Sequence, residues 1–272
     1  MNYCIISSSF TPGTVARSAA LFMLLAAAVA PAARAELPAD VAERYRSGLI
    51  GDIDHALGGA RELRNRVAAH DIPGAQKAWI DSRIGWERSE VFTAGFVPEL
   101  DDAIDAWPNA VAGFHGIEAK LFAVNPSDFQ DEMDALIGHL TTLDEQIRTI
   151  KLTPQGLLNG ITRLAYEVGE SKVDGGESRL SGTSLNDMRN NADGIDVAYR
   201  TLFASSLEAA DAKLAEEVRG QIDQLKALLA VEDLKEVDPD ALRKTSEALT
   251  VSLQAAGPKI GLATPTLEDV AK

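Results

Sequence analysis

The chain has 272 residues, of which 41 are acidic and 26 are basic, so its formal net charge at pH 7 is −15. A charge this negative argues against nucleic acid or an anionic membrane surface as a partner. It is compatible with a protein that handles cations, although an acidic surface that keeps an exported protein soluble is the commoner explanation.

The first 35 residues have the features of a secretory signal peptide. Residues 19–30 form an apolar run of the length expected for the core of such a peptide, and Arg17 supplies the positive flank. Ala33-Arg34-Ala35 is a typical cleavage site. The run is too short to span a bilayer comfortably. We therefore expect cleavage after Ala35, export to the periplasm and no direct insertion into the membrane.

The single cysteine, Cys4, lies within this signal peptide and ahead of its apolar run. A lipoprotein cysteine would follow the run, so Cys4 is in the wrong place for that role. The mature chain would hold no thiol, which excludes disulfides and cysteine-based zinc or iron–sulfur sites.

The rest of the sequence has the apolar period of helices. From Val41 to Ala69, leucines and isoleucines recur near every 3.6 residues. A break at residues 71–74 precedes a second predicted helix through Trp79 and Val91. No run of alternating β-branched residues indicates a strand.

Three later positions have helix-start signals. Ser127 and Gln130 have the spacing of a capping box ahead of a predicted helix over 133–150. Thr153-Pro154 and Asp238-Pro239 each place a capping residue before a proline in the first helical turn.

These elements predict an all-α fold of two packed bundles of the four-helix type. We place the first bundle at 36–152, the second at 153–256 and a C-terminal tail at 257–272. Two long breaks, Phe96–Gly113 and Gly169–Thr183, are predicted loops, and loops of that length are often functional.

The sharpest local feature is the segment from Gly113 to Phe122, GFHGIEAKLF. His115 and Glu118 are three residues apart, so on a helix they share one face. An imidazole beside a carboxylate suits iron, zinc or copper. Taken alone, the pair is also consistent with an ordinary helix-surface His–Glu pair.

Acidic residues on the preceding elements strengthen the metal hypothesis. Glu87 and Glu90 share a helical face, and an acidic turn at 100–105 ends in Asp105. Helices of one bundle can direct such carboxylates to a common point. The alternative is a solvated face on which Arg83 and Arg88 pair with the two glutamates.

Three tryptophans admit two interpretations. Trp79, Trp86 and Trp107 could form a wall on which a sugar stacks, or they could anchor helix packing. The second interpretation is favoured because large aromatic side chains commonly fill helical cores.

The stretch from Trp79 to Phe122 resembles the imelysin-like (EfeO/EfeM) family. It has that family's aromatic–Glu pair at Trp86-Glu87, its D-x-x-I-D turn ending at Asp105, and its G-F-H-x-x-E-x-x-L-F segment. A second segment, Gly182–Gly194, is similar to another family pattern, matching at Thr183, Leu185, Asp187, Asn191 and Gly194.

The resemblance implies a periplasmic iron-binding component of an uptake system rather than an enzyme. Iron would be the bound ion, with zinc or copper as alternatives. The implied metal residues are Glu87, Glu90, Asp105, His115 and Glu118. The implied partners are a membrane iron permease and a periplasmic haem-peroxidase-like component. The chain resembles the short form of the family, without a cupredoxin domain.

Three other functions were weighed against iron binding. A polysaccharide-binding protein of the alginate-binding kind ranks second. An imelysin-type metallopeptidase ranks third, since Gly116 follows His115 and the zincin motif H-E-x-x-H is absent. A ferritin-like di-iron oxidase is disfavoured because Leu136 and Ala112 stand where its Glu-x-x-His motifs need glutamates.

Overall fold

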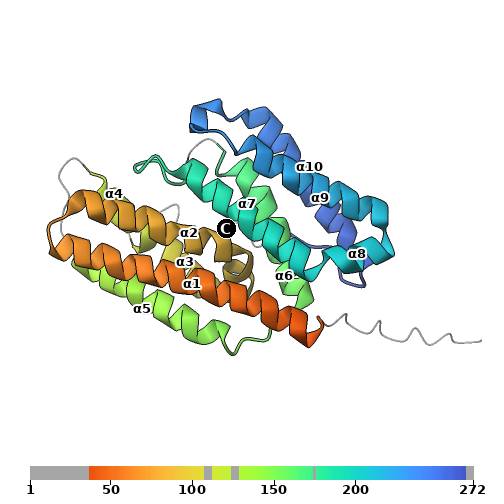
Figure 1. Cartoon of the computed structure of the whole chain (residues 1–272), viewed down its shortest axis with the longest axis horizontal. Coiled ribbons are helices and arrows are strands. Elements are labelled where there is room, and N and C mark those ends of the chain that lie inside the picture. The colour runs from red at the N-terminus through yellow and green to blue at the C-terminus, as the bar shows by residue number, and fades with distance from the viewer. Residues whose placement is uncertain (1–36, 107–111, 124–128, 174–175, 268–272) are drawn as a thin grey trace, which may run out of the picture. The chain divides into compact units, whose positions relative to one another are not determined.

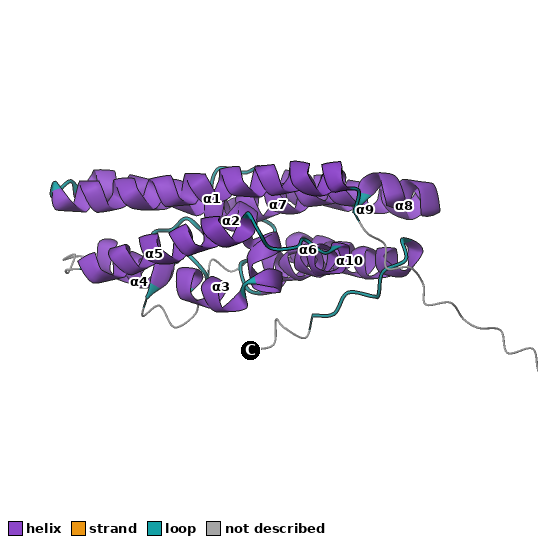
Figure 2. Ribbon diagram, turned by 90° about the horizontal axis from the view of Figure 1, so that it is seen from below, coloured by secondary structure: helices purple, strands orange, loops and turns teal. Residues whose placement is uncertain are grey.

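The computed structural model describes residues 37–106, 112–123, 129–173 and 176–267, and every element within these ranges is helical (Figure 2). The predicted all-α class is confirmed. The predicted signal peptide lies outside the described residues. The helices are α1 (Ala39–Ala68), α2 (Ile72–Phe96), α3 (Pro98–Asp105), α4 (Gly113–Leu121), α5 (Gln130–Ile147), α6 (Pro154–Glu170), α7 (Ser184–Leu202), α8 (Ala204–Ala210), α9 (Ala212–Leu228), the 3₁₀ helix η1 (Leu234–Glu236) and α10 (Pro239–Lys259).

Side chains cap two helices where the sequence signals predicted, at Thr153 and Asp238, and Asp71 caps a third. Asp71 accepts a hydrogen bond from the backbone N–H of Gly74, and Thr153 accepts one from Gly156. Asp238 accepts from two backbone N–H groups at the start of α10. These bonds satisfy donors that have no partner inside the first turn of a helix.

The predicted start of α5 is only partly tested. Ser127, half of the expected capping box, lies outside the described residues. The helix begins at Gln130 rather than Met133 and ends at Ile147 rather than Ile150. Phe129 occupies the capping position and makes no side-chain hydrogen bond there.

The predicted loop at 96–113 contains a helix, α3. Pro98 starts it, and Glu99 and Asp101 lie in its first turn. Proline is favoured at this position, and acidic side chains interact well with the positive end of the helix dipole. The acidic segment 100–105 is therefore helical rather than a turn. The helix ends at Asp105, after which Ala106 takes a left-handed conformation with φ 59°.

Within the described residues, the predicted loop at 169–183 is non-helical from 171 to 173 and from 176 to 183. Its described part folds inward, since Lys172, Glu177 and Ser178 are all buried. The backbone N–H groups of Gly182 and Thr183 both donate to the carbonyl oxygen of Ser178. These bonds close a turn at the surface, where Leu180 is exposed, directly before α7.

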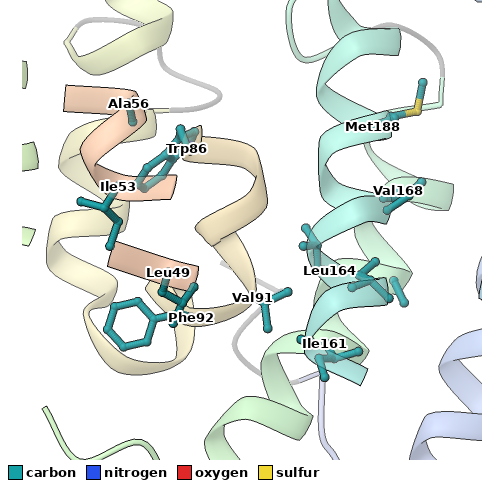
Figure 3. Close-up of a cluster of buried hydrophobic side chains, with 14 of the residues drawn as sticks. Leu49, Ile53, Ala56, Trp86, Val91, Phe92, Ile161, Leu164, Val168 and Met188 are labelled. Carbon is teal, nitrogen blue, oxygen red and sulfur yellow. The ribbon is translucent and has the colours of Figure 1, made fainter. Parts of the chain in front are cut away.

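Helix α2 lies at the centre of the helical unit. It packs against α1, α3, α4, α6 and α7, and Figure 1 shows it between α1 and α7. In Figure 3, Ile53 of α1 lies beside Trp86, and Val91 of α2 points towards Ile161 of α6. Contacts therefore cross the predicted boundary at 152/153, and the division into two bundles stays a prediction.

Two glycines allow α6 and α7 to approach α2 closely. A Cβ atom at Gly194 would lie 2.6 Å from the carbonyl oxygen of Arg88, and one at Gly160 would collide with the carbonyl oxygen of Val91. The missing side chains let the helix backbones meet. As a result, the polar side chains of α7 reach those of α2.

The C-terminal helices have an apolar interface. Along α9 and α10, fully buried aliphatic side chains recur at helical spacing: Val218, Ile222, Leu225, Leu249 and Leu253.

The last helix continues two residues beyond the predicted start of the tail, to Lys259. The chain then packs back: Leu262 is buried, and the N–H of Ala263 donates to Gln155 Oε1 at 2.8 Å. Within the described residues, each helix is too short or too polar to cross a bilayer.

Candidate metal centre

A buried cluster of charged side chains lies where α2, α3, α4, α7 and the segment after α6 meet. Each element contributes at least one charged or strongly polar group. The cluster comprises Arg83, Glu87 and Glu90 from α2, Asp105 from α3, His115 and Glu118 from α4, Lys172 and Glu177 from the 171–183 segment, and Asp187 and Asn191 from α7.

Helix α4 is positioned by its first residue. Gly113 has φ 56°, a conformation that side chains disfavour, and a Cβ atom there would collide with the carbonyl oxygen of Ile104. Because of this close approach, His115 faces the end of α3. His115 Nε2 lies 3.5 Å from Asp105 Oδ1.

Glu118 supports the imidazole from its other side. Glu118 Oε2 lies 3.2 Å from His115 Nδ1. Its Oε1 accepts hydrogen bonds from the backbone N–H groups of Leu180 and Ser181, and from Ser181 Oγ at 2.7 Å. Glu118 therefore orients the histidine ring and also holds the end of the 171–183 segment.

Five side chains of the cluster bring potential ligand atoms together. In one group, an oxygen from each of Glu87, Glu90, Asp105 and Glu177 lies within 4.8 Å of the others. In a second, overlapping group, the same holds for Asp105, His115 and Glu177. Four of the five predicted metal-binding residues therefore belong to at least one of these groups, whereas Glu118 belongs to neither.

Glu177 was not among the predicted residues. Its segment was expected to be functional because of its length, but no spacing in the sequence connects it to α2. A side chain in an irregular segment has no helical period from which its direction can be deduced. The family-like segment at 182–194 gave the nearest signal, since Asp187 and Asn191 of that segment also enter the cluster.

Two cations lie among these carboxylates. Arg83 contacts Glu87, Glu177 at 2.8 Å and Asp187 at 3.4 Å, and its other terminal nitrogen contacts Asp105 at 2.8 Å. Lys172 Nζ lies 3.1 Å from Glu87, 3.0 Å from Glu90 and 2.9 Å from Glu177. Both side chains are buried.

The interpretation of Glu87 and Glu90 as a solvated surface face is thereby overturned. Glu87 is fully buried and Glu90 is 8% exposed, because α6 and α7 cover this side of α2. Arg83 does pair with Glu87, but in the interior. Arg88 points elsewhere, towards Asp193 at 3.5 Å and Asp52 at 4.0 Å.

Helix α7 supplies hydrogen bonds to the two glutamates. Asn191 Nδ2 donates to Glu87 Oε2 at 2.8 Å and to Glu90 Oε2 at 2.7 Å. Asp187 accepts from Ser178 Oγ. Asp187 Oδ1 and Asn191 Oδ1 are buried and have no hydrogen-bond partner among the described residues. Buried oxygens without partners are rare in folded proteins, and a bound cation is one group that could satisfy them.

Two of the three tryptophans are core residues. Trp79 and Trp86 are fully buried, and they donate through Nε1 to the carbonyl oxygen of Phe114 and to Asp105 Oδ1, both at 3.1 Å. The Arg83 guanidinium carbon lies 5.6 Å from the centre of the Trp79 ring. The core interpretation is confirmed for both, and Trp107 lies outside the described residues.

Burial and crowding shift the pKa values of the centre in opposite directions. Burial raises the pKa of Glu177 to about 8 despite Lys172, and burial together with the charge of Glu87 raises that of Glu90 strongly. For Glu87, burial is outweighed by Arg83 and Lys172, which lower its pKa. Burial alone would lower the pKa of His115, but Asp105 outweighs it and raises the value to about 9.

The centre thus has more anionic than cationic groups. Six carboxyl groups (Glu87, Glu90, Asp105, Glu118, Glu177 and Asp187) surround two permanent cations and one imidazole. The raised pKa values of Glu90 and Glu177 favour protonation of these two carboxyl groups, which reduces the excess of negative charge. Carboxylate and imidazole ligands suit a divalent or trivalent transition metal, so the donor set fits such an ion.

Fold and site together define an all-α protein with a buried, anionic histidine–carboxylate centre. The sequence profile of the imelysin family matches residues 43–110 and 109–257. The chain belongs to the imelysin family. The predicted resemblance is confirmed.

Relatives of similar sequence have EfeM or EfeO in their names. An Efem/EfeO family lipoprotein of Staphylococcus haemolyticus is 30% identical over 198 residues, covering 69% of this chain and 68% of the relative. The iron uptake system component EfeM of Pseudomonas syringae is 25% identical over 272 residues, covering 93% and 95%.

A solved structure has the same fold. It belongs to a Parabacteroides distasonis protein assigned as an iron-regulated protein A precursor, and it superposes with a TM-score of 0.64. The match covers 84% of this chain and 97% of that one, at 17% identity. At that identity, the likeness concerns the fold alone.

Proposed function

We propose that this protein is an exported iron-binding component of an EfeM-type uptake system. Relatives across most of its length bear that name. In this proposal the ion is cargo, and the protein binds it without a chemical reaction. The observation that carries the proposal is the convergence of Glu87, Glu90, Asp105 and Glu177 within 4.8 Å, in a buried cluster with an excess of carboxyl groups.

The proposed ligands are oxygens of Glu87, Glu90, Asp105 and Glu177 together with Nε2 of His115. Mixed oxygen and nitrogen ligands accommodate iron, and also zinc or copper, so selection among ions depends on supply and geometry. Glu118 has a different role: it holds His115 Nδ1 and so presents Nε2 to the ion. Such supporting carboxylates are common behind metal-binding histidines.

In the proposed pathway, export places the protein in the periplasm, where it receives iron and passes it to a membrane permease. A haem-peroxidase-like protein is the other proposed partner. The predicted signal peptide at 1–35 supports export, and several relatives are named lipoproteins. The acidic surface would raise the local concentration of cations.

A polysaccharide-binding role has less support. A sugar site on a helical protein commonly needs exposed aromatic faces, and Trp79 and Trp86 are fully buried. A peptidase role rests on the name of the matching family alone. We propose binding rather than hydrolysis because relatives such as EfeM of Pseudomonas syringae are named iron uptake components.

The test is a calorimetric titration of the purified, metal-stripped protein with ferric and ferrous ions, each at one pH and ionic strength. The proposal expects one tight site per chain in the wild type and its loss in His115→Ala. His139→Ala is the matched control, since His139 lies on α5, outside the cluster, and should leave binding intact. Equal binding by wild type and His115→Ala, or binding by neither, would overturn the proposal.

A further inference from the structure

We propose that Lys172 is a resident cation of this centre: its ammonium group holds the carboxylates together in the metal-free protein and leaves them when the ion binds. The inference rests on the proposed function and adds to it a residue that controls loading. Its basis is the position of one amino group among three of the four clustered carboxylates.

The ammonium group of Lys172 has one carboxylate partner for each of its three hydrogens. Its Nζ donates to Glu87 Oε2 at 3.1 Å, to Glu90 Oε2 at 3.0 Å and to Glu177 Oε1 at 3.0 Å. A lysine ammonium has three N–H donors and no acceptor, so these three hydrogen bonds engage all of its donors. Its position is the one from which a cation would contact all three oxygens.

A metal ion and this ammonium compete for the same oxygens. Oxygen ligands approach a transition metal to about 2.0–2.2 Å, closer than they approach the lysine nitrogen. Glu87, Glu90 and Glu177 would have to contract around the ion. The ammonium would then lie next to a second positive charge, which repels it. Metal binding is therefore an exchange of one cation for another.

Of the two cations in the centre, Lys172 is the one free to leave. Arg83 lies in the middle of α2, is fully buried and has its guanidinium beside the rings of Trp79 and Phe114. Its planar group is also bound to carboxylates on several sides. Lys172 lies two residues after the end of α6, outside any helix. A flexible four-carbon stem allows its amino group to swing away.

The exchange makes the centre selective. In the metal-free protein Lys172 neutralises part of the carboxylate charge, so a weakly bound cation gains little by entering. An ion must offset the loss of three charge-assisted hydrogen bonds, each stronger than a neutral one. Ions with high charge and affinity for both imidazole and carboxylate satisfy this condition best.

The first arm of the test uses the wild-type protein and an amine-reactive acetylating reagent, with labelling of each lysine read by mass spectrometry. Without metal, Lys172 should be protected, since its side chain is 7% exposed. One equivalent of ferric ion should raise its labelling severalfold. Lys213 is the internal control, because its side chain is 87% exposed and should label equally in both states.

The second arm compares the iron affinity of Lys172→Met with that of Lys213→Met. Removing the competing ammonium should tighten iron binding by about tenfold or more, corresponding to at least one 1.4 kcal/mol step. Lys213→Met should bind as the wild type does. Unchanged or weaker binding by a folded Lys172→Met would overturn the proposal. If that variant does not fold, the labelling result decides.

The two arms separate this inference from the proposed function. Iron bound by the wild type through His115, with Lys172 still protected, would overturn the role of Lys172 and leave the iron-binding function standing. Absence of iron binding in the wild type would overturn both.

Discussion

The interior around α2 and the interface between α9 and α10 are both buried, but charged side chains fill the first and aliphatic side chains fill the second. Between α9 and α10, aliphatic side chains such as Ile222 and Leu253 fill the space, and the charges lie outside. Around α2, a comparable position is filled by Arg83, Glu87 and Lys172. Apolar burial stabilises a fold directly, whereas buried charges must recover a large desolvation cost through their partners.

The comparison shows which region serves the fold and which serves the proposed function. Replacing a buried ion cluster by apolar residues is often neutral or stabilising. Stability alone therefore gives no reason for six carboxyl groups around α2. A cation-binding site does explain the six carboxyl groups, because a bound cation offsets the negative charge that they bury in excess. The following predictions, from the largest expected effect to the smallest, test this distinction.

The largest effect should follow from Arg83→Met. This change leaves Glu87, Asp105, Glu177 and Asp187 without their shared cation. Removing one partner of a buried charge cluster costs about 3–5 kcal/mol. We expect a loss of this size in the free energy of unfolding of the metal-free protein, measured with urea.

The matched control for Arg83 is Arg200→Met. Arg200 pairs with Asp196 and Asp223, but its side chain is 45% exposed. Exposed pairs contribute roughly 0.2–1 kcal/mol, so this variant should unfold near the wild-type midpoint. Similar losses for both arginines would mean that burial of the α2 cluster carries no special cost.

A cavity in the apolar interface should affect stability without affecting iron. Leu253 is fully buried in α10. Leu253→Ala should lower the free energy of unfolding by about 2–5 kcal/mol. Titrated well below its unfolding temperature, the variant should retain wild-type iron affinity. A large change in that affinity would show that the two regions are coupled.

The pH dependence of stability should also reveal the centre. Glu177 has a folded pKa of about 8 against an ordinary 4.5, so the folded protein binds more protons than the unfolded chain between those values. Likewise, His115 has a pKa of about 9, and the stability it contributes is complete below pH 6.5 and lost as pH rises through 9. Both effects make the metal-free protein less stable as pH rises.

Thermal unfolding at pH 6 and pH 8.5 measures this effect. We expect stability to fall by at least about 2 kcal/mol between the two values, given 1.36 kcal/mol for each unit of pKa shift. Glu87 and Asp105, whose pKa values are lowered, lose their contribution only in acid and do not interfere. Iron should bind more tightly at pH 8.5, because it replaces protons. Metal-free stability that is constant or rises over this range would contradict the assignment.

The smallest effect expected is that of Glu118→Gln. The variant keeps one oxygen for Ser181 or His115 but loses the charge that holds the imidazole. Loss of a carboxylate behind a metal-binding histidine typically weakens metal affinity about 10–100-fold. Glu43→Gln on the exposed side of α1 serves as the control. Wild-type affinity in Glu118→Gln would argue against its supporting role.

Much of the fold could be predicted because its signals are local. A 3.6-residue apolar period and the caps at Asp71, Thr153 and Asp238 lie within a few residues of the helices they define. Helix α3 was missed because it has only eight residues, and its apolar face is marked by little more than Leu100 and Ile104. The helix depends instead on Pro98 and on packing against α4 and α5.

The candidate site could be predicted only in part. His115 and Glu118 pair through helical spacing, and Arg83 and Glu87 pair for the same reason. The burial of Arg83 and Glu87 was not predictable, because it comes from α6 and α7, which lie far along the chain. Lys172 contacts Glu87 across 85 residues of sequence, so no local pattern indicates it. Glu177 was missed for the same reason.

The most direct test of the central claim is a crystal structure of the protein grown with one equivalent of ferric ion, with iron located by its anomalous scattering. We predict a single iron peak among the proposed ligands Glu87, Glu90, Asp105, His115 and Glu177, with the Lys172 amino group displaced from it. Iron found only on exposed acidic residues, or no iron peak in crystals of a protein that binds it in solution through His115, would contradict the account.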